Sequence, residues 1–208
     1  MIRLAVYSLF LLLSFLLVTN CDDGLETVSE QDEFGNTITY KRRKVDAARQ
    51  GLAETTDPIG QLIELAHYEA DTLHGQRILF YVTGDTNIVE NYNMGVFDGP
   101  YRAYFEEGIL KQEGQYKNNE LVGTWRSYHD NGQLKEAVQF ANNEENGPFV
   151  EYHPDGKLAA EGSYLDGDNE HGELKIYNEN GELLRTMMCD KGRCQTTWSA
   201  DAPENTKE

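Results

Sequence analysis

The chain has 208 residues, and its 36 Asp and Glu against 18 Lys and Arg give a formal net charge of −18 at pH 7. A surface this acidic repels phosphate backbones and anionic lipid head groups, so nucleic acid is a poor partner. The 39% of hydrophobic residues include a large apolar block at the N-terminus, while Gly (19) and Tyr (12) are frequent. The rest of the chain therefore predicts a thin, aromatic-rich sheet and excludes a thick aliphatic core.

Residues 1–20 have the pattern of a signal peptide. Arg3 precedes an unbroken apolar run over residues 4–18. That run is short for a transmembrane helix, which needs about 20 apolar residues. The residues before Cys21 resemble the lipobox of bacterial lipoproteins, with the departure that Asn20 stands where Gly, Ala or Ser is usual.

The lipobox resemblance implies that Cys21 is lipidated and becomes the mature N-terminus. A simply cleaved signal and an uncleaved anchor are the alternatives. We expect a lipoprotein of the bacterial cell envelope, in the outer membrane and facing the periplasm or the exterior. The acidic pair Asp22 and Asp23 leaves inner-membrane retention open. Residues 21–33 are polar and acidic, so we expect them to form a tether.

Glycine recurs in two series with a period of 24 or 25 residues. The first series lies at positions 35, 60, 84, 108, 132, 156 and 181, and the second at 51, 75, 99, 123, 147 and 172. Aromatic residues keep fixed places relative to the first series, for example Tyr104, Tyr128 and Tyr152 four residues before it. This regularity predicts tandem repeats, each one a supersecondary unit.

Each unit has the pattern of a β-hairpin. A short aromatic strand runs into Asn131-Gly132, and such residues tolerate the positive φ that a tight two-residue turn requires. We expect the second-series glycine to close a looser turn into the next unit. Because one unit cannot bury its aromatic face alone, neighbours must stack. The prediction is an all-β fold, an elongated antiparallel meander of about 24-residue hairpin repeats.

The repeats differ in quality along the chain. Residues 34–75 are read as divergent N-terminal repeats or a cap, although 57–75 could form a helix by propensity alone. Residues 76–198 form the repeat array, and 199–208 a disordered tail. Trp125 and Tyr128 lie three apart, so either both faces of the sheet carry aromatics or a bulge intervenes.

The units GTWRSYHDNGQLKEAVQF and GPYRAYFEEGILKQEGQY resemble the bacterial variant of the MORN repeat. The resemblance is good over residues 75–188 and weak over 35–75. It implies an elongated antiparallel sheet that serves as a scaffold or binding surface, with no catalytic residues. Some bacterial proteins with this repeat are catalogued as antitoxin components, and eukaryotic relatives are associated with membranes and phosphoinositides. The acidic charge argues against direct binding of anionic lipid here.

The candidate binding surface is the set of repeated aromatic residues Tyr101, Tyr104, Trp125, Tyr128, Phe149, Tyr152 and Tyr177. Since Cys21 is accounted for by lipidation, Cys189 and Cys194 form an even pair in an oxidising compartment, and we expect a disulfide between them over free thiols.

Three further groups of residues allow both a functional and a simpler structural interpretation. His129 and His153 share a repeat position, and a polar ladder beside the turns is favoured over a metal site because no third ligand repeats with them. The segment 166–170 is read as an acidic turn over a calcium loop. The basic cluster 41–44 is read as a solvated strand end over a contact with a negative partner. We expect no metal and no cofactor.

The sequence favours a non-enzymatic envelope lipoprotein whose repeats bind a protein or cell-wall partner. The alternative is an antitoxin or immunity-type protein that neutralises a basic toxin or effector. A glycan hydrolase that uses two carboxylates is disfavoured, because it needs a deep pocket with a perturbed Asp or Glu, which a thin sheet can scarcely provide.

Overall fold

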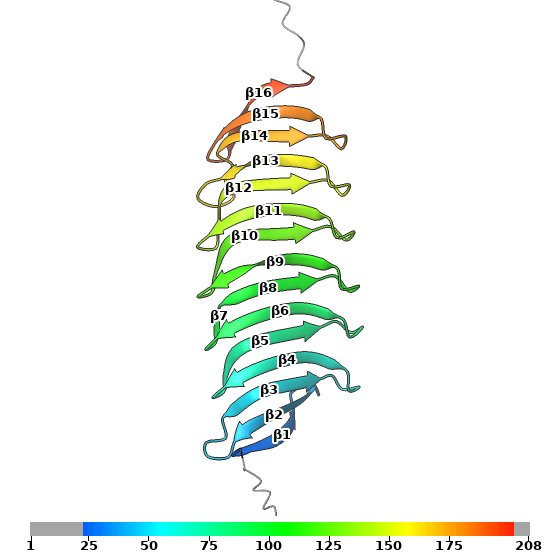
Figure 1. Ribbon diagram of the computed structural model, residues 1–208, viewed down its shortest axis with the longest axis vertical. Coiled ribbons are helices and arrows are strands. Elements are labelled where there is room, and N and C mark those ends of the chain that lie inside the picture. The colour runs from blue at the N-terminus through cyan, green and yellow to red at the C-terminus, as the bar shows by residue number, and fades with distance from the viewer. Residues whose placement is uncertain (1–22, 202–208) are drawn as a thin grey trace, which may run out of the picture.

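A computed structural model of the chain describes residues 23–201 and consists of one open antiparallel sheet (Figure 1). Strands follow each other in chain order across the sheet, except that the short β7 pairs only with β6. The predicted all-β meander of hairpin repeats is confirmed. Within the described residues no helix is present that could cross a membrane.

The sixteen strands have the following bounds: β1 Leu25–Gln31, β2 Thr37–Arg43, β3 Arg49–Thr56, β4 Leu62–Glu69, β5 Thr72–Phe80, β6 Thr86–Asn93, β7 Val96–Phe97, β8 Gly99–Tyr104, β9 Leu110–Lys117, β10 Glu120–Tyr128, β11 Leu134–Ala141, β12 Glu144–Tyr152, β13 Leu158–Tyr164, β14 Gly172–Tyr177, β15 Leu183–Asp190 and β16 Arg193–Ser199.

The loops on one long edge of the sheet contain the first-series glycines. In the loop between β10 and β11, the His129 N–H donates to the Gln133 carbonyl and the Gly132 N–H donates to the His129 carbonyl. Gly132 has φ 81°, whereas Asn131 has no positive φ. This is a three-residue loop built on a type I turn and a glycine bulge. The expected two-residue turn at this edge is therefore wrong.

Two-residue turns lie on the opposite edge instead. Asn118 and Asn119 have φ 52° and 68°, Asn142 and Asn143 have φ 54° and 68°, and the flanking residues pair directly. Two consecutive positive φ values are typical of the type I′ turn. The expectation that second-series glycines close these turns is wrong, because Gly123 lies inside β10 at φ 74°, where the pairing register with β9 shifts. A glycine bulge at this place bends the strand.

The two-residue turns also join each hairpin to the one before. The Asn119 side-chain oxygen accepts from the Phe97 N–H at 2.8 Å, and the Asn119 N–H donates to the Phe97 carbonyl. Asn143 makes the same two contacts with Leu121 one repeat later. Asparagine therefore supplies both the positive φ and a side-chain acceptor.

The N-terminal part of the chain is sheet from its first described residues. The predicted tether is wrong for residues 25–31, which form β1 and pair with β2 along their whole length. Charge pairing supports this acidic strand, because Glu26 lies opposite Arg42 and accepts its Nε at 2.7 Å. Residues 57–75, for which a helix was the alternative, contribute β4 and the start of β5.

The core lies on one face of this single sheet. Val138 lies directly opposite both Trp125 and Phe149, and Val138 and Phe149 are 2% and 4% exposed. Glycines on the intervening strands make room for the large rings, since a Cβ at Gly114 would collide with Trp125 and one at Gly162 with Phe149. Neighbouring strands thus bury side chains against each other without a second layer.

Candidate binding surface

The predicted aromatic surface is divided between the two faces of the sheet. Trp125 packs over Gly114, whereas the Tyr128 hydroxyl donates to Glu113 at 2.9 Å. Glu113 and Gly114 are consecutive in β9 and so point to opposite faces. Trp125 and Tyr128 therefore lie on opposite faces, called here the Trp125 face and the Tyr128 face, and both faces carry aromatics.

Tyr101, Trp125 and Phe149 belong to the packed Trp125 face. The rings of Tyr101 and Trp125 stack at 5.4 Å between centroids, and Phe149 stacks on Tyr164 at 4.3 Å. Such aromatic pairs add stability beyond the area they bury. Phe149 is buried, whereas Tyr101 and Trp125 are half-buried, so these rings contribute to the core of the sheet on this face.

The same face holds an ion network nearer the N-terminus. Arg77 donates from Nε to Glu64 at 2.8 Å and from Nη1 to Glu90 at 3.3 Å. Glu90 is only 9% exposed and also accepts from the Tyr92 hydroxyl at 3.0 Å. Burial and the hydrogen bond to Glu90 raise the pKa of Tyr92 to about 12. The network neutralises a buried carboxylate.

A glycan hydrolase, the disfavoured alternative, would use two carboxylates that face each other. Glu136 and Glu151 lie directly opposite each other, and burial together with Glu136 raises the pKa of Glu151. They line a hollow of about 270 Å³ with His129, Lys135 and Tyr152. In the part of the chain that the structure describes, no three His, Cys, Asp or Glu side chains are grouped to hold a metal.

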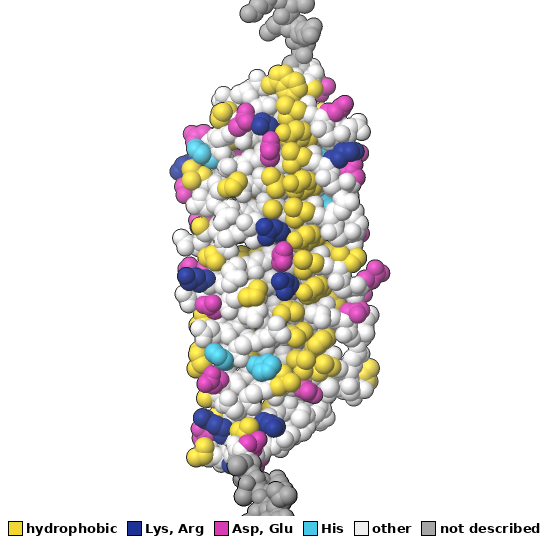
Figure 2. Space-filling view, in the orientation of Figure 1, with side chains coloured by type: hydrophobic (Ala, Val, Ile, Leu, Met, Phe, Trp, Pro, Cys, Tyr) yellow, Lys and Arg dark blue, Asp and Glu magenta, His cyan; other side chains and the backbone are white. Residues whose placement is uncertain are grey.

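A band of tyrosines and leucines runs across the Tyr128 face. Tyr128 pairs with Leu134 in the next strand, and the same pairing recurs in the neighbouring hairpins. All eight side chains are half-buried. Figure 2 shows a continuous hydrophobic band along the long axis of the molecule. The Tyr/Leu band comprises Tyr104, Leu110, Tyr128, Leu134, Tyr152, Leu158, Tyr177 and Leu183.

A row of direct cross-strand partners runs beside the band, two residues away in each tyrosine-bearing strand. It contains charges of alternating sign, with Arg102 3.7 Å from Glu113 and Lys175 3.3 Å from Glu161. In Figure 2 basic and acidic side chains lie next to the hydrophobic band. The charged row comprises Val89, Arg102, Glu113, Arg126, Ala137, Val150, Glu161, Lys175, Thr186 and Trp198.

Glutamates of the charged row hold two tyrosines of the band. The Tyr177 hydroxyl donates to Glu161 at 2.9 Å, as Tyr128 does to Glu113. Burial and the Glu113 hydrogen bond raise the pKa of Tyr128, so the phenol stays neutral. The band therefore presents apolar rings whose positions are fixed by their neighbours.

The repeated histidines lie beside the three-residue loops. His129 Nε2 is 2.9 Å from the Tyr152 carbonyl oxygen, and His153 Nε2 is 3.4 Å from that of Tyr177. Tyr81, which was not predicted as a contact residue, belongs to the same set, because its hydroxyl donates to the Tyr104 carbonyl at 2.7 Å. Its position, two repeats before His129, was the available signal. These side chains link the end of one hairpin to the next.

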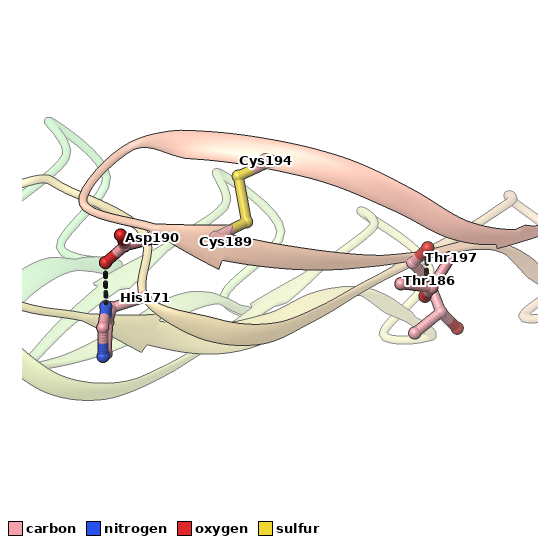
Figure 3. The surroundings of a disulfide bond; sticks show 6 residues. All are labelled: His171, Thr186, Cys189, Asp190, Cys194 and Thr197. Carbon is pink, nitrogen blue, oxygen red and sulfur yellow. Dashed lines mark hydrogen bonds and ion pairs between the residues drawn. A yellow bond between two sulfur atoms is a disulfide. The ribbon is translucent and has the colours of Figure 1, made fainter.

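Cys189 and Cys194 are disulfide-bonded in the structure (Figure 3). They lie directly opposite each other in β15 and β16, and Cys189 is 3% exposed against Leu174. His171 Nδ1 lies 3.5 Å from the Asp190 carboxylate, and Figure 3 shows the two side chains facing each other. The disulfide joins the last two strands at the end of the core. The predicted lipidation site, Cys21, lies outside the described residues.

The remaining candidate groups make local contacts. In segment 166–170, Asp166 has φ 56° within a turn and its carboxylate is 3.3 Å from Lys191. In the basic cluster 41–44, Arg42 and Arg43 face the carboxylates of Glu26 and Asp46.

The sheet and its periodic surface define a tandem β-hairpin repeat protein. Four segments match the family described as MORN repeat variant, and they cover residues 97–118, 121–142, 145–166 and 170–188. The four matched segments run from β7 to β15 and contain all residues of the Tyr/Leu band. A search of curated proteins found no match.

Proposed function

We propose that this protein is a non-enzymatic binding module of the bacterial cell envelope. A lipid on Cys21 anchors it, and the Tyr/Leu band meets a protein or cell-wall partner. The observation that carries the proposal is the continuous band on the Tyr128 face. Large contiguous apolar patches on a monomer mark interaction sites.

The composition of the band suits recognition. Tyrosine gives a large contact area with little side-chain entropy to lose on binding. Tyr128 and Tyr177 are already held by hydrogen bonds to Glu113 and Glu161. Because these rings are ordered before a partner arrives, less free energy is lost on association.

The shallow relief of the described sheet supports binding over catalysis. Glu136 and Glu151, the facing carboxylates, line a small hollow, and no three metal-ligating side chains are grouped among the described residues. A long band contacts an extended partner, while small-molecule chemistry needs a concave, water-excluding pocket.

The test is recovery of partners from solubilised envelopes with the full-length protein and two matched variants. Leu134→Glu places a carboxylate in the band, and Gln115→Glu adds the same charge at an exposed position outside it. We expect wild type and Gln115→Glu to recover the same partner, and Leu134→Glu to lose it. Equal recovery by Leu134→Glu, or no specific partner for wild type, contradicts the proposal.

The anchor has a separate test. Cells fed radiolabelled palmitate should incorporate label into the wild-type chain and not into Cys21→Ser. Label retained by Cys21→Ser, or absent from both chains, contradicts lipidation at this residue.

A further inference from the structure

We propose that the Tyr/Leu band binds a second copy of this chain, in a face-to-face dimer whose two sheets run in opposite strand order. The inference rests on the proposed function, because it names the partner of the same band. A sheet ordinarily buries its apolar face against a second layer. No element among residues 23–201 covers the Tyr128 face, since all of them belong to the one sheet.

A two-fold axis can lie parallel to the strands, midway between the two copies and between β11 and β12. This axis reverses the strand order but keeps the long edge that carries the three-residue loops on the same side. It therefore places band on band and charged row on charged row. β12 then faces β11 of the second copy, β13 faces β10, β14 faces β9, and β15 faces β8.

The band is self-complementary in this register. Its tyrosines lie on β8, β10, β12 and β14, and its leucines lie on the strands between. Every tyrosine therefore meets a leucine of the other copy, with Tyr152 over Leu134 and Tyr128 over Leu158 next to the axis. Large side chains against smaller ones allow two sheets to interdigitate.

The charged row is complementary in the same register. Arg126 of one copy faces Glu161 of the other, Glu113 faces Lys175, and Ala137 faces Val150. Arg126 is exposed and makes no ion pair within the described part of its own chain, so the second copy supplies its counter-charge.

A shift by one strand destroys the complementarity of both rows. In one direction Glu113 comes to face Glu161, and in the other Arg126 comes to face Lys175. Either shift also places tyrosines over tyrosines and leucines over leucines. Facing like charges cost several kcal/mol across an interface, so the charges select one register.

The contact area is sufficient for a reversible dimer. The overlap runs from β6 to β16, about 43 Å at a strand spacing of about 4.8 Å. Band and row lie two residues apart along each strand. With the breadth of the side chains included, they are together about 13 Å wide. The dimer then buries about 1,100 Å² in total, near the lower limit of specific interfaces. Packed sheets rotate by about 30°, so contact is closest on β10 to β13.

The test is a charge exchange followed by sedimentation equilibrium of the full-length protein in density-matched detergent. Arg126→Glu and Glu161→Arg each place like charges opposite each other, and each should weaken the dimer about tenfold or more. The double variant restores opposite charges and should recover wild-type affinity within about threefold. In one chain the two residues lie three strands apart, about 14 Å, so a rescue reports contact between copies.

Lys117→Glu, an exposed change at the other long edge, is the control and should dimerise like wild type. Circular dichroism of each variant checks that the sheet is intact. A wild-type protein that is monomeric at every concentration overturns the proposal, as does a double variant no tighter than the single ones. If the protein is monomeric while envelope recovery still depends on Leu134, the dimer is wrong and the proposed function stands.

Discussion

On the Trp125 face, the row of directly paired residues that runs through Val138 is called here the core row. It is filled differently in the two halves of the chain. In the hairpins before β7, its positions are held by Tyr40, Ala53, Ala66 and the ion pair of Arg77 with Glu90. From β10 onward the same row holds Trp125, Val138, Phe149 and Leu174. Both halves nevertheless form hairpins with the same three-residue loops, and two-residue turns occur in both, at residues 70–71 as at 118–119.

This difference indicates that the loops determine the architecture, whereas the core row determines the stability of the sheet. Positive-φ residues recur at both edges through the whole described chain, at Gly35 and Gly60 as at Gly132 and Gly156. The matched repeats begin at residue 97, near the point where large hydrophobic residues become frequent in the core row. A family pattern with strong aromatic positions therefore identifies the second half more readily than the first.

The largest expected loss of stability comes from a substitution at a buried position of the core row. Phe149→Ala should lower the free energy of unfolding by about 3–5 kcal/mol, because it opens a cavity beside Val138. Tyr40→Ala, in the same row but half-buried near the first strand, should cost under about 2 kcal/mol. Urea unfolding followed by circular dichroism measures both. Equal losses would show that the two halves are packed alike.

The ion network should give the next effect. Arg77→Met leaves Glu90 buried without its cation, and we expect a loss of about 2 kcal/mol. The double variant Arg77→Met/Glu90→Leu removes the orphaned charge and should be more stable than the single variant. The same unfolding experiment decides this. If the double variant is the less stable one, the network contributes net stability beyond neutralising Glu90.

A turn variant tests the claim that loops set the architecture. Asn143→Ala places at φ 68° an alanine, which tolerates the left-handed region less well than asparagine, and removes the hydrogen bond from the Leu121 N–H, which should cost about 2 kcal/mol. Asn143→Gly keeps the conformation and loses only the side-chain bond, so it should cost about 1 kcal/mol. Thermal unfolding compares them. A glycine variant as unstable as the alanine variant would assign the effect to the side chain alone.

The smallest effect is a pH dependence in the alkaline range. The folded state raises the pKa of Tyr92 from 10 to about 12, so above pH 10 the unfolded chain loses this proton more readily. The linked stability is complete below pH 10 and is lost as the pH rises towards 12. Tyr92→Phe should make this decline shallower in unfolding curves recorded from pH 9 to 12. An unchanged slope would remove Tyr92 as a contributor.

Much of the fold could be predicted because glycine spacing reports where the backbone needs positive φ. Spacing does not report loop length, so the tight two-residue turn was assigned to the wrong edge. β1 was missed because it is acidic and polar, and its pairing depends on charges on β2 such as Arg42.

The repeated aromatic residues of the candidate surface could be identified from their spacing, but their distribution over the two faces could not. A common repeat period does not show which face a residue occupies, so Tyr101 and Tyr104 were grouped although they lie on opposite faces. The leucines of the band, such as Leu134, were visible as a repeat but were not joined to the tyrosines. That pairing depends on the register of β10 with β11.

Hydrogen exchange of the full-length protein tests most directly whether one sheet runs through both halves. We expect slow exchange for backbone amides of β4 and β5, residues 62–69 and 72–80, as for β10 and β11. Exchange of those N-terminal segments at the rate of an unfolded chain, with residues 97–188 protected, would contradict it.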